Sequence, residues 1–330
     1  MYHFRNLLIL CTGLLLCNAC TSRQEKELLQ KAIEIVDHNP RKALLLLDSI
    51  SSPKSMGKYD YMRYIVILTQ ARSLDYQDIT DNDRILDAQD YFTRKNDPEM
   101  ATRASYYAAS YWNEKGEVDK QLKYELMANQ YARQAGNDLF QVKSAHWIGS
   151  IYYNKEVLDS ALVYYHRAEQ LCNTEGYSEK DRLDLLYMIG RTYNELGQVE
   201  KASVYFDNGL IQAQKLHNCL YEANFLQHKG VIFRDKGDYA QARECLDRAL
   251  SKRPASIDSL RIYLGYAKLY RLSGQRDSNK YYVDLVKNRI DELTWGPNRE
   301  WAFKEFQLEF ERRLNRNPLL KAAYNNKRSY

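Results

Sequence analysis

The chain has 330 residues, of which 28% are charged and 45% hydrophobic, and its net charge is +5. This balance excludes a disordered chain and a polytopic membrane protein, and the absence of a clustered basic block argues against a nucleic-acid partner. The 14 glycine and 6 proline residues are too few for the frequent turns of a β-sandwich or barrel. Tyrosine is in excess, with 28 residues against 9 phenylalanines. An all-helical protein that repeats one half-buried aromatic position is therefore favoured.

Residues 1–19 have the layout of a secretory signal, in which Arg5 precedes an apolar run from Leu7 to Leu16. That run is too short to span a bilayer as a stable helix. The segment Cys17-Asn18-Ala19-Cys20 resembles the lipobox of bacterial lipoproteins, in which the final cysteine is diacylated and becomes the first residue. Cys17 stands where that family usually has leucine, so ordinary signal cleavage and an uncleaved anchor stay open as alternatives.

The lipoprotein resemblance implies lipid on Cys20, a polar lipidated tether over residues 20–27, and a folded part beside a membrane of the cell envelope. The outer membrane is the expected location, and the resemblance leaves open whether the protein faces the periplasm or the cell surface. Three cysteines remain beyond the tether, so at most one disulfide can form, and which of them pair is open: Cys172, Cys219 and Cys245.

A repeat of about forty residues runs through the chain, marked by Gly149, Gly190 and Gly230. Each glycine is followed by an aromatic residue at +3, an alanine at +12, a large apolar residue at +16 and a small residue at +19. These residues resemble the tetratricopeptide repeat, whose pattern is W-x2-L-G-x2-Y, then A-x3-F, then A, then P. Weaker copies surround Ala109 and Ala267, and two further helix pairs are expected upstream.

The resemblance implies an all-α fold, a tetratricopeptide-type α-solenoid of about six helix pairs over residues 28–290. Glycine on the first helix and alanine on the second would let the two backbones approach closely. Residues 291–330 are expected to supply a C-terminal capping helix and a polar tail, because a terminal repeat needs a cover. The apolar residues of that helix recur at helical spacing and are Phe303, Phe306, Phe310 and Leu314.

Capping signals place several helix boundaries. Gly136 is expected to end one helix, and Asn137 or Asp138 to cap the next. Ser178-x-x-Asp181 is a capping box, and Pro98 is suited to the first turn of another helix.

Known catalytic patterns are missing from the sequence. The six histidines form no HExxH and no pair three or four residues apart, and no G-x-S-x-G, P-loop or G-x-G-x-x-G occurs. We therefore expect no enzyme, no cofactor and no metal site.

Tetratricopeptide arrays bind partners on a concave surface lined by first-helix residues at −6, −3, +1, +4 and +5 from the repeat glycine. Here those places are mostly polar, with tyrosines as rigid anchors and a cluster of cations toward the end that suits an acidic partner segment. The alternative is that most of them are merely solvated. The predicted partner-binding groove consists of Arg103, Tyr106, Asn113, His146, Tyr153, Asn154, Tyr187, Arg191, Asn194, Gln227, Arg234, Arg261, Lys268 and Arg271.

The sequence therefore predicts a membrane-anchored scaffold that binds a protein or peptide partner in this groove without catalysis. One alternative is envelope signalling, because long arrays behind a signal sequence resemble the sensor halves of some bacterial regulators, and residues 39–50 resemble their first repeat. Another alternative is glycan capture, since outer-membrane starch-binding lipoproteins also carry tetratricopeptide helices. The identity of the partner and the oligomeric state stay open.

Overall fold

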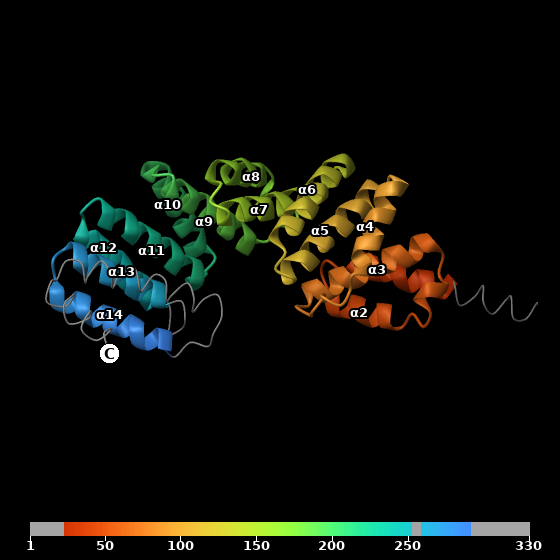
Figure 1. Ribbon diagram of the computed structural model, residues 1–330, viewed down its shortest axis with the longest axis horizontal. Helices are drawn as coiled ribbons and strands as arrows, with labels where there is room; N and C mark the ends of the chain where they lie inside the picture. The colour runs from red at the N-terminus through yellow and green to blue at the C-terminus, as the bar shows by residue number, and fades with distance from the viewer. Residues whose placement is uncertain (1–22, 253–258, 292–330) are drawn as a thin grey trace, which may run out of the picture. The chain divides into compact units, whose positions relative to one another are not determined.

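The computed structural model describes residues 23–252 and 259–291, and every regular element within them is helical (Figure 1). The predicted all-α class of tetratricopeptide type is confirmed. The signal segment, Cys20 and the predicted capping helix near Phe303 lie outside the described residues. The fold divides into two compact units, one ending at Tyr177 and the other beginning at Ser178. We call them unit 1 and unit 2 and describe each by itself.

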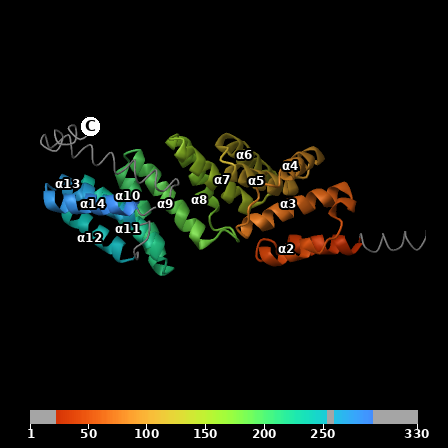
Figure 2. The same cartoon turned by 60° about the horizontal axis from the view of Figure 1, so that its bottom comes forward.

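Consecutive helices pair in both units, as Figures 1 and 2 show. Unit 1 begins with a helix over residues 23–35, which shares a core with the next two helices. The other helices of unit 1 are α2 (Pro40–Asp48), α3 (Lys58–Leu74), α4 (Arg84–Lys95), α5 (Pro98–Glu114), α6 (Val118–Ala135), α7 (Asp138–Asn154) and α8 (Leu158–Leu171), with a short 3-10 turn η1 (Pro53–Ser55) before α3.

Unit 2 contains three pairs, α9 (Glu179–Glu195) with α10 (Val199–Lys215), α11 (Cys219–Asp235) with α12 (Tyr239–Ser251), and α13 (Ser259–Leu272) with α14 (Arg276–Asp291). The first helices α9, α11 and α13 also contact one another in sequence order. The described parts of both units together hold seven helix pairs, compared with the expectation of about six.

The repeat glycines fit directly against the large side chain sixteen residues later. A Cβ atom added to Gly149 would lie 2.6 Å from the Tyr165 ring, and one added to Gly190 would lie 2.5 Å from the Phe206 ring. Both distances are far inside van der Waals contact, so only glycine leaves room for the ring. At these two repeats the atoms nearest the glycine belong to the ring at +16, rather than to the alanine at +12 that was expected to allow the close approach.

A second recurring contact joins the aromatic residue at +3 to the one at +15. Tyr152 stacks on Tyr164 with ring centroids 5.7 Å apart, and Tyr193 stacks on Tyr205 at 5.6 Å. Offset stacking of this kind stabilises aromatic pairs beyond the area they bury. The doublet Tyr164-Tyr165 therefore has two structural roles, because Tyr164 pairs with Tyr152 while Tyr165 fills the space left by Gly149.

The turns follow the same period. Gly116, Gly197 and Gly237 lie seven residues after the repeat position and have φ values of 72°, 72° and 81°, in the left-handed region that favours glycine. Glu156 occupies the equivalent place in the α7–α8 turn with φ 61° and departs from the glycine rule.

The capping predictions are confirmed. Gly136 ends α6 in the left-handed conformation, and the side chain of Asn137 accepts a hydrogen bond from the backbone N–H of Phe140. Ser178 caps α9 by accepting from the N–H of Asp181, and α5 begins at Pro98. Residues 97, 137, 178 and 218 all cap first helices in this way, so the forty-residue period is fixed partly by the caps.

Glu125 breaks the core pattern. It lies sixteen residues after Ala109, the place that Tyr165 and Phe206 occupy in later repeats, and it is only 2% exposed. Its Oε2 atom is buried and has no hydrogen-bond partner among the described residues. Burial raises the pKa of this carboxyl group well above its ordinary value.

We predict that Glu125→Leu raises the free energy of unfolding by about 1–3 kcal/mol at neutral pH, because it removes an unsatisfied buried group. The folded-state pKa exceeds the unfolded value, so folding loses stability as pH rises from about 4.3 through the folded pKa. The advantage of the variant should grow over that range in urea titrations at stepwise pH values. Glu200→Leu, at an exposed position of α10, is the control and should show no such trend. A constant difference across pH would contradict the prediction.

Candidate functional site

Arg103 of unit 1 is held in an internal polar network. Its Nη1 donates to Gln70 Oε1 at 3.0 Å and lies 3.2 Å from Asp37 Oδ2, and Gln70 Nε2 donates to Asp37 Oδ1 at 2.7 Å. The Arg103 side chain is 15% exposed, and its guanidinium also lies over the ring of Phe140. These contacts join three successive repeats, so Arg103 has a structural role in addition to any contact with a partner.

The aromatic positions of the predicted groove in unit 1 are half-buried rather than open. Tyr106 packs edge-on against Phe140 with centroids 5.2 Å apart. A hydrogen bond of 2.8 Å joins His146 Nδ1 to the hydroxyl oxygen of Tyr177. Tyr153 is half-buried as well, while Asn113 and Asn154 are exposed.

In unit 2, the corresponding side chains gather around His228. The Tyr187 hydroxyl lies 3.1 Å from His228 Nε2, and the ring of His228 stacks on Phe206 at 5.1 Å. Arg191 lies over the Tyr187 ring, 5.4 Å from its centroid. Burial, together with the charges of Arg191 and Arg261, lowers the pKa of His228 to about 3, so this histidine is neutral at physiological pH.

Tyr187 is more buried than a groove residue is expected to be. Its side chain is only 8% exposed, and its ring has edge-on contacts with Tyr221, Phe225 and His228. The Tyr221 hydroxyl donates in turn to Asp184 Oδ1 at 2.9 Å. The aromatic cluster is therefore rigid, and its packing requires Tyr187 whether or not a partner binds.

The remaining predicted positions of unit 2 are half-buried and lie on the first helices. Arg234 pairs with the neighbouring Asp235 at 2.7 Å. The other members are Asn194, Gln227, Arg261, Lys268 and Arg271.

The structure therefore brings some of the predicted residues together within each unit, most clearly Tyr187, Arg191 and Arg261 around His228. Sequence reasoning missed His228, which lies two residues before Gly230, outside the register used. It also missed Asp37 and Gln70, because their repeats carry no glycine. Gln70 follows Thr69, which takes the glycine place in α3. A helix pair was expected there, but without the glycine no register was assigned to its first helix.

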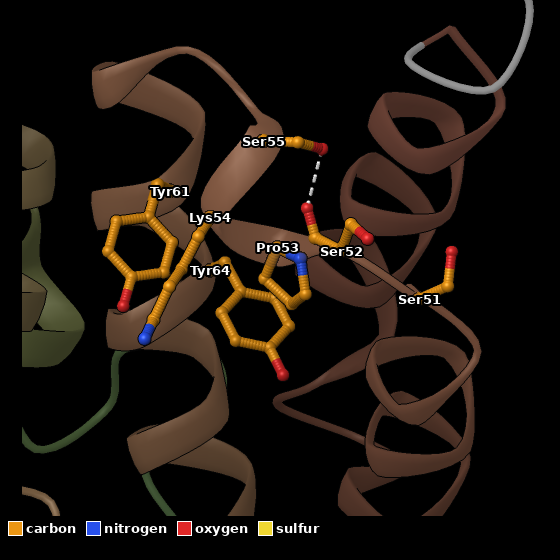
Figure 3. Close-up of a pocket in the computed structure, with 7 residues that line it drawn as sticks. All are labelled: Ser51, Ser52, Pro53, Lys54, Ser55, Tyr61 and Tyr64. Carbon is orange, nitrogen blue, oxygen red and sulfur yellow. Dashed lines mark hydrogen bonds between the residues drawn. The ribbon is translucent and has the colours of Figure 1, made fainter. Parts of the chain in front are cut away.

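Sequence reasoning also missed a cavity in unit 1 of about 610 Å³, lined by residues 51–55, Tyr61 and Tyr64 (Figure 3). It lies between the η1 turn and α3, away from the predicted groove positions. Nothing in the repeat pattern marks these residues, because the η1 segment belongs to a connection between helix pairs.

The described residues contain no group of three His, Cys, Asp or Glu side chains placed to hold a metal ion. Within that same part of the chain, no helix combines the length and the apolar character needed to cross a membrane. Within the described part of the chain, Cys172, Cys219 and Cys245 form no disulfide.

We predict that Arg103→Met lowers the free energy of unfolding by about 1.5–3 kcal/mol, because hydrogen bonds to Asp37 and buried Gln70 are lost. Asn113→Ala, at an exposed predicted groove position, should change it by less than about 0.5 kcal/mol. Chemical denaturation of both variants beside the wild type measures the difference. Equal stability of Arg103→Met and the wild type would show that the network contributes nothing.

Comparison with known proteins identifies the repeats. Residues 183–210 and 223–255 match the tetratricopeptide repeat model, so the chain carries such repeats there. The transcriptional activator NprA of Geobacillus stearothermophilus is 26% identical over 113 residues, which are 34% of this chain and 28% of that protein. The regulatory protein RapG of Bacillus subtilis is 22% identical over 155 residues, 46% of this chain and 41% of that protein. The chain thus matches less than half the length of these curated relatives.

Solved structures share the fold across most of the chain. NprR in complex with its cognate peptide NprX is similar with a TM-score of 0.63 and 16% identity, over 91% of this chain and 88% of that one. A Rap protein complexed with competence and sporulation factor has a TM-score of 0.56 and 12% identity, over 87% and 78%. The fold is therefore a tetratricopeptide-type helical fold similar to that of these two proteins.

Proposed function

We propose that the protein is a non-catalytic scaffold that binds a protein or peptide segment on the faces of its first helices, while lipid on Cys20 tethers it to the outer membrane. The observation that carries the binding proposal is the cluster in unit 2. There, Tyr187, Arg191 and His228 come from neighbouring first helices and are fixed by mutual contacts before any partner arrives. A preorganised aromatic and cationic surface loses little side-chain freedom on binding.

The charge of this surface suits an acidic segment. Arg191 and Arg261 act together on His228, and Lys268 and Arg271 follow on α13. Guanidinium groups form charge-assisted hydrogen bonds with carboxylates and are geometrically specific for them. The similar structures include proteins complexed with the peptide NprX and with competence and sporulation factor, and this likeness of fold supports a peptide as the partner.

Envelope signalling is a second candidate. Its support is that the two curated relatives are a transcriptional activator and a regulatory protein. In that case the bound segment would act as a signal. Its binding would change how the scaffold contacts another protein, without any catalysed reaction.

In-cell photo-cross-linking tests the binding surface. A benzophenone amino acid at Tyr153 in unit 1 and at Asn194 in unit 2 should capture a discrete polypeptide, identified by mass spectrometry. Val163 of α8 and Val204 of α10, which are 50% and 58% exposed on second helices, are matched control positions. Tyr187 is avoided because its substitution would open a buried cavity. The same adducts in equal yield from the controls would contradict a first-helix binding face.

Metabolic labelling with a fatty acid tests the tether. Label is expected on the wild type and on Cys219→Ala, which changes an exposed thiol, but not on Cys20→Ala. Two acyl chains anchor a protein stably where one does so only marginally, so a wild type diacylated on Cys20 should also stay with the membrane fraction through a high-salt wash. Label retained by Cys20→Ala would overturn the lipoprotein assignment.

A further inference from the structure

The cavity between η1 and α3 has the size of a small-ligand site. Its volume of about 610 Å³ lies within the range of about 300–1,000 Å³ that such sites occupy. Tyr61 and Tyr64 lie one turn apart on α3, and Figure 3 shows the Lys54 side chain extending between their rings. The wall therefore combines two aromatic rings and Pro53 with a cation.

Tyr61 is set up as a hydrogen-bond donor. Arg84 Nη1 donates to its hydroxyl oxygen at 2.6 Å, so the Tyr61 proton is directed to a different acceptor. A cationic donor on a phenol oxygen also strengthens that phenol as a donor, because hydrogen bonds in a chain polarise one another. Within the described residues no acceptor for the Tyr61 proton is found.

Lys54 is the second donor. Among the described residues its ammonium group has no ion pair and no hydrogen bond. Tyr64 is half-buried beside it, and burial, followed by the charge of Asp48, raises the pKa of its phenol. Tyr64 therefore stays protonated and presents an O–H group together with its ring.

The serines and the nearby acid are already engaged. Ser51 Oγ and the N–H of Ser52 both donate to Glu25 Oε1 at 3.2 Å, and Ser55 Oγ donates to the carbonyl of Ser52 at 2.7 Å. The Glu25 carboxylate therefore already accepts hydrogen bonds from this segment. The groups left to act on a ligand are the donors Lys54, Tyr61 and Tyr64.

We propose that this cavity binds a carboxylate carried on an apolar body, the chemistry of the C-terminus of a short peptide or of an aromatic acid. The carboxylate would accept hydrogen bonds from Lys54 and Tyr61, and the apolar body would lie against the Tyr64 ring and Pro53. A phosphate dianion suits the cavity less, because Lys54 is the single cation among the described residues that line it and Asp48 is close to Tyr64. None of the residues predicted for the groove lines this site, and the proposal does not depend on the function proposed for them.

Ligand-observed NMR on the full chain tests this site with stated probes. The probes are acetyl-Ala-Phe with a free C-terminal carboxylate, its C-terminal amide, phenylacetate and phenyl phosphate. The free peptide should bind at least about fivefold more tightly than its amide, since a charge-assisted hydrogen bond is lost in the amide. Lys54→Ala and Tyr61→Phe should each weaken carboxylate binding by a similar factor, whereas Lys58→Ala, which removes an exposed cation at the start of α3, should not.

The probes also separate the possible sources. Tighter binding of the peptide than of phenylacetate assigns the site to a peptide terminus, and the reverse assigns it to a small aromatic acid; both support the proposal. It is overturned by equal binding of acid and amide or by tighter binding of phenyl phosphate. It is also overturned if no probe binds at a concentration of about 10 mM, tenfold above a Kd of about 1 mM, or if Lys54→Ala binds as the wild type does. Circular dichroism of each variant confirms that loss of binding is not loss of fold.

Discussion

A close contact within the helix pair, between a glycine on the first helix and a ring on the second, is the constraint on which the repeats at Gly149 and Gly190 depend. At Gly149 and Gly190 any side chain would overlap Tyr165 or Phe206. This contact fixes the depth at which the two helices interlock, because protein interiors are close-packed and cannot absorb an added methyl group without moving a neighbour. The stacked pairs at +3 and +15, such as Tyr152 with Tyr164, then fix the rotation of the helices.

Where the constraint is relaxed, the chain carries other residues. The α5–α6 pair has Ala109 in place of glycine and Glu125 in place of the ring, and a buried carboxyl occupies the space that an aromatic residue fills in later repeats. The α7–α8 turn has Glu156 where four other described turns have glycine, namely Gly116, Gly197, Gly237 and Gly274. Each exception is local, because the neighbouring caps and turns keep the forty-residue period.

The sequence was sufficient for the parts of the fold that depend on spacing. Glycine, aromatic and alanine offsets, together with Asn137, Ser178 and Pro98, predict the repeat class and several helix ends, because these features act within one pair or one turn. The partners of Arg103 were not predictable in this way. Asp37 and Gln70 are 66 and 33 residues away in the chain, in repeats whose first helices lack the marker glycine.

The same limit applies to the candidate binding surface. A place in the repeat register indicates which face of a first helix a residue occupies, but neighbouring helices decide whether its side chain is available. The −3 place holds half-buried Tyr106 and His146 in unit 1 and Tyr187, only 8% exposed, in unit 2, because Tyr221, Phe225 and His228 cover the Tyr187 ring. A tyrosine at this place can therefore stabilise the stack of first helices and shape the surface around it without itself contacting a partner. On such a surface the exposed polar residues, such as Asn154, are better probes of binding than the buried aromatic residues that hold them in place.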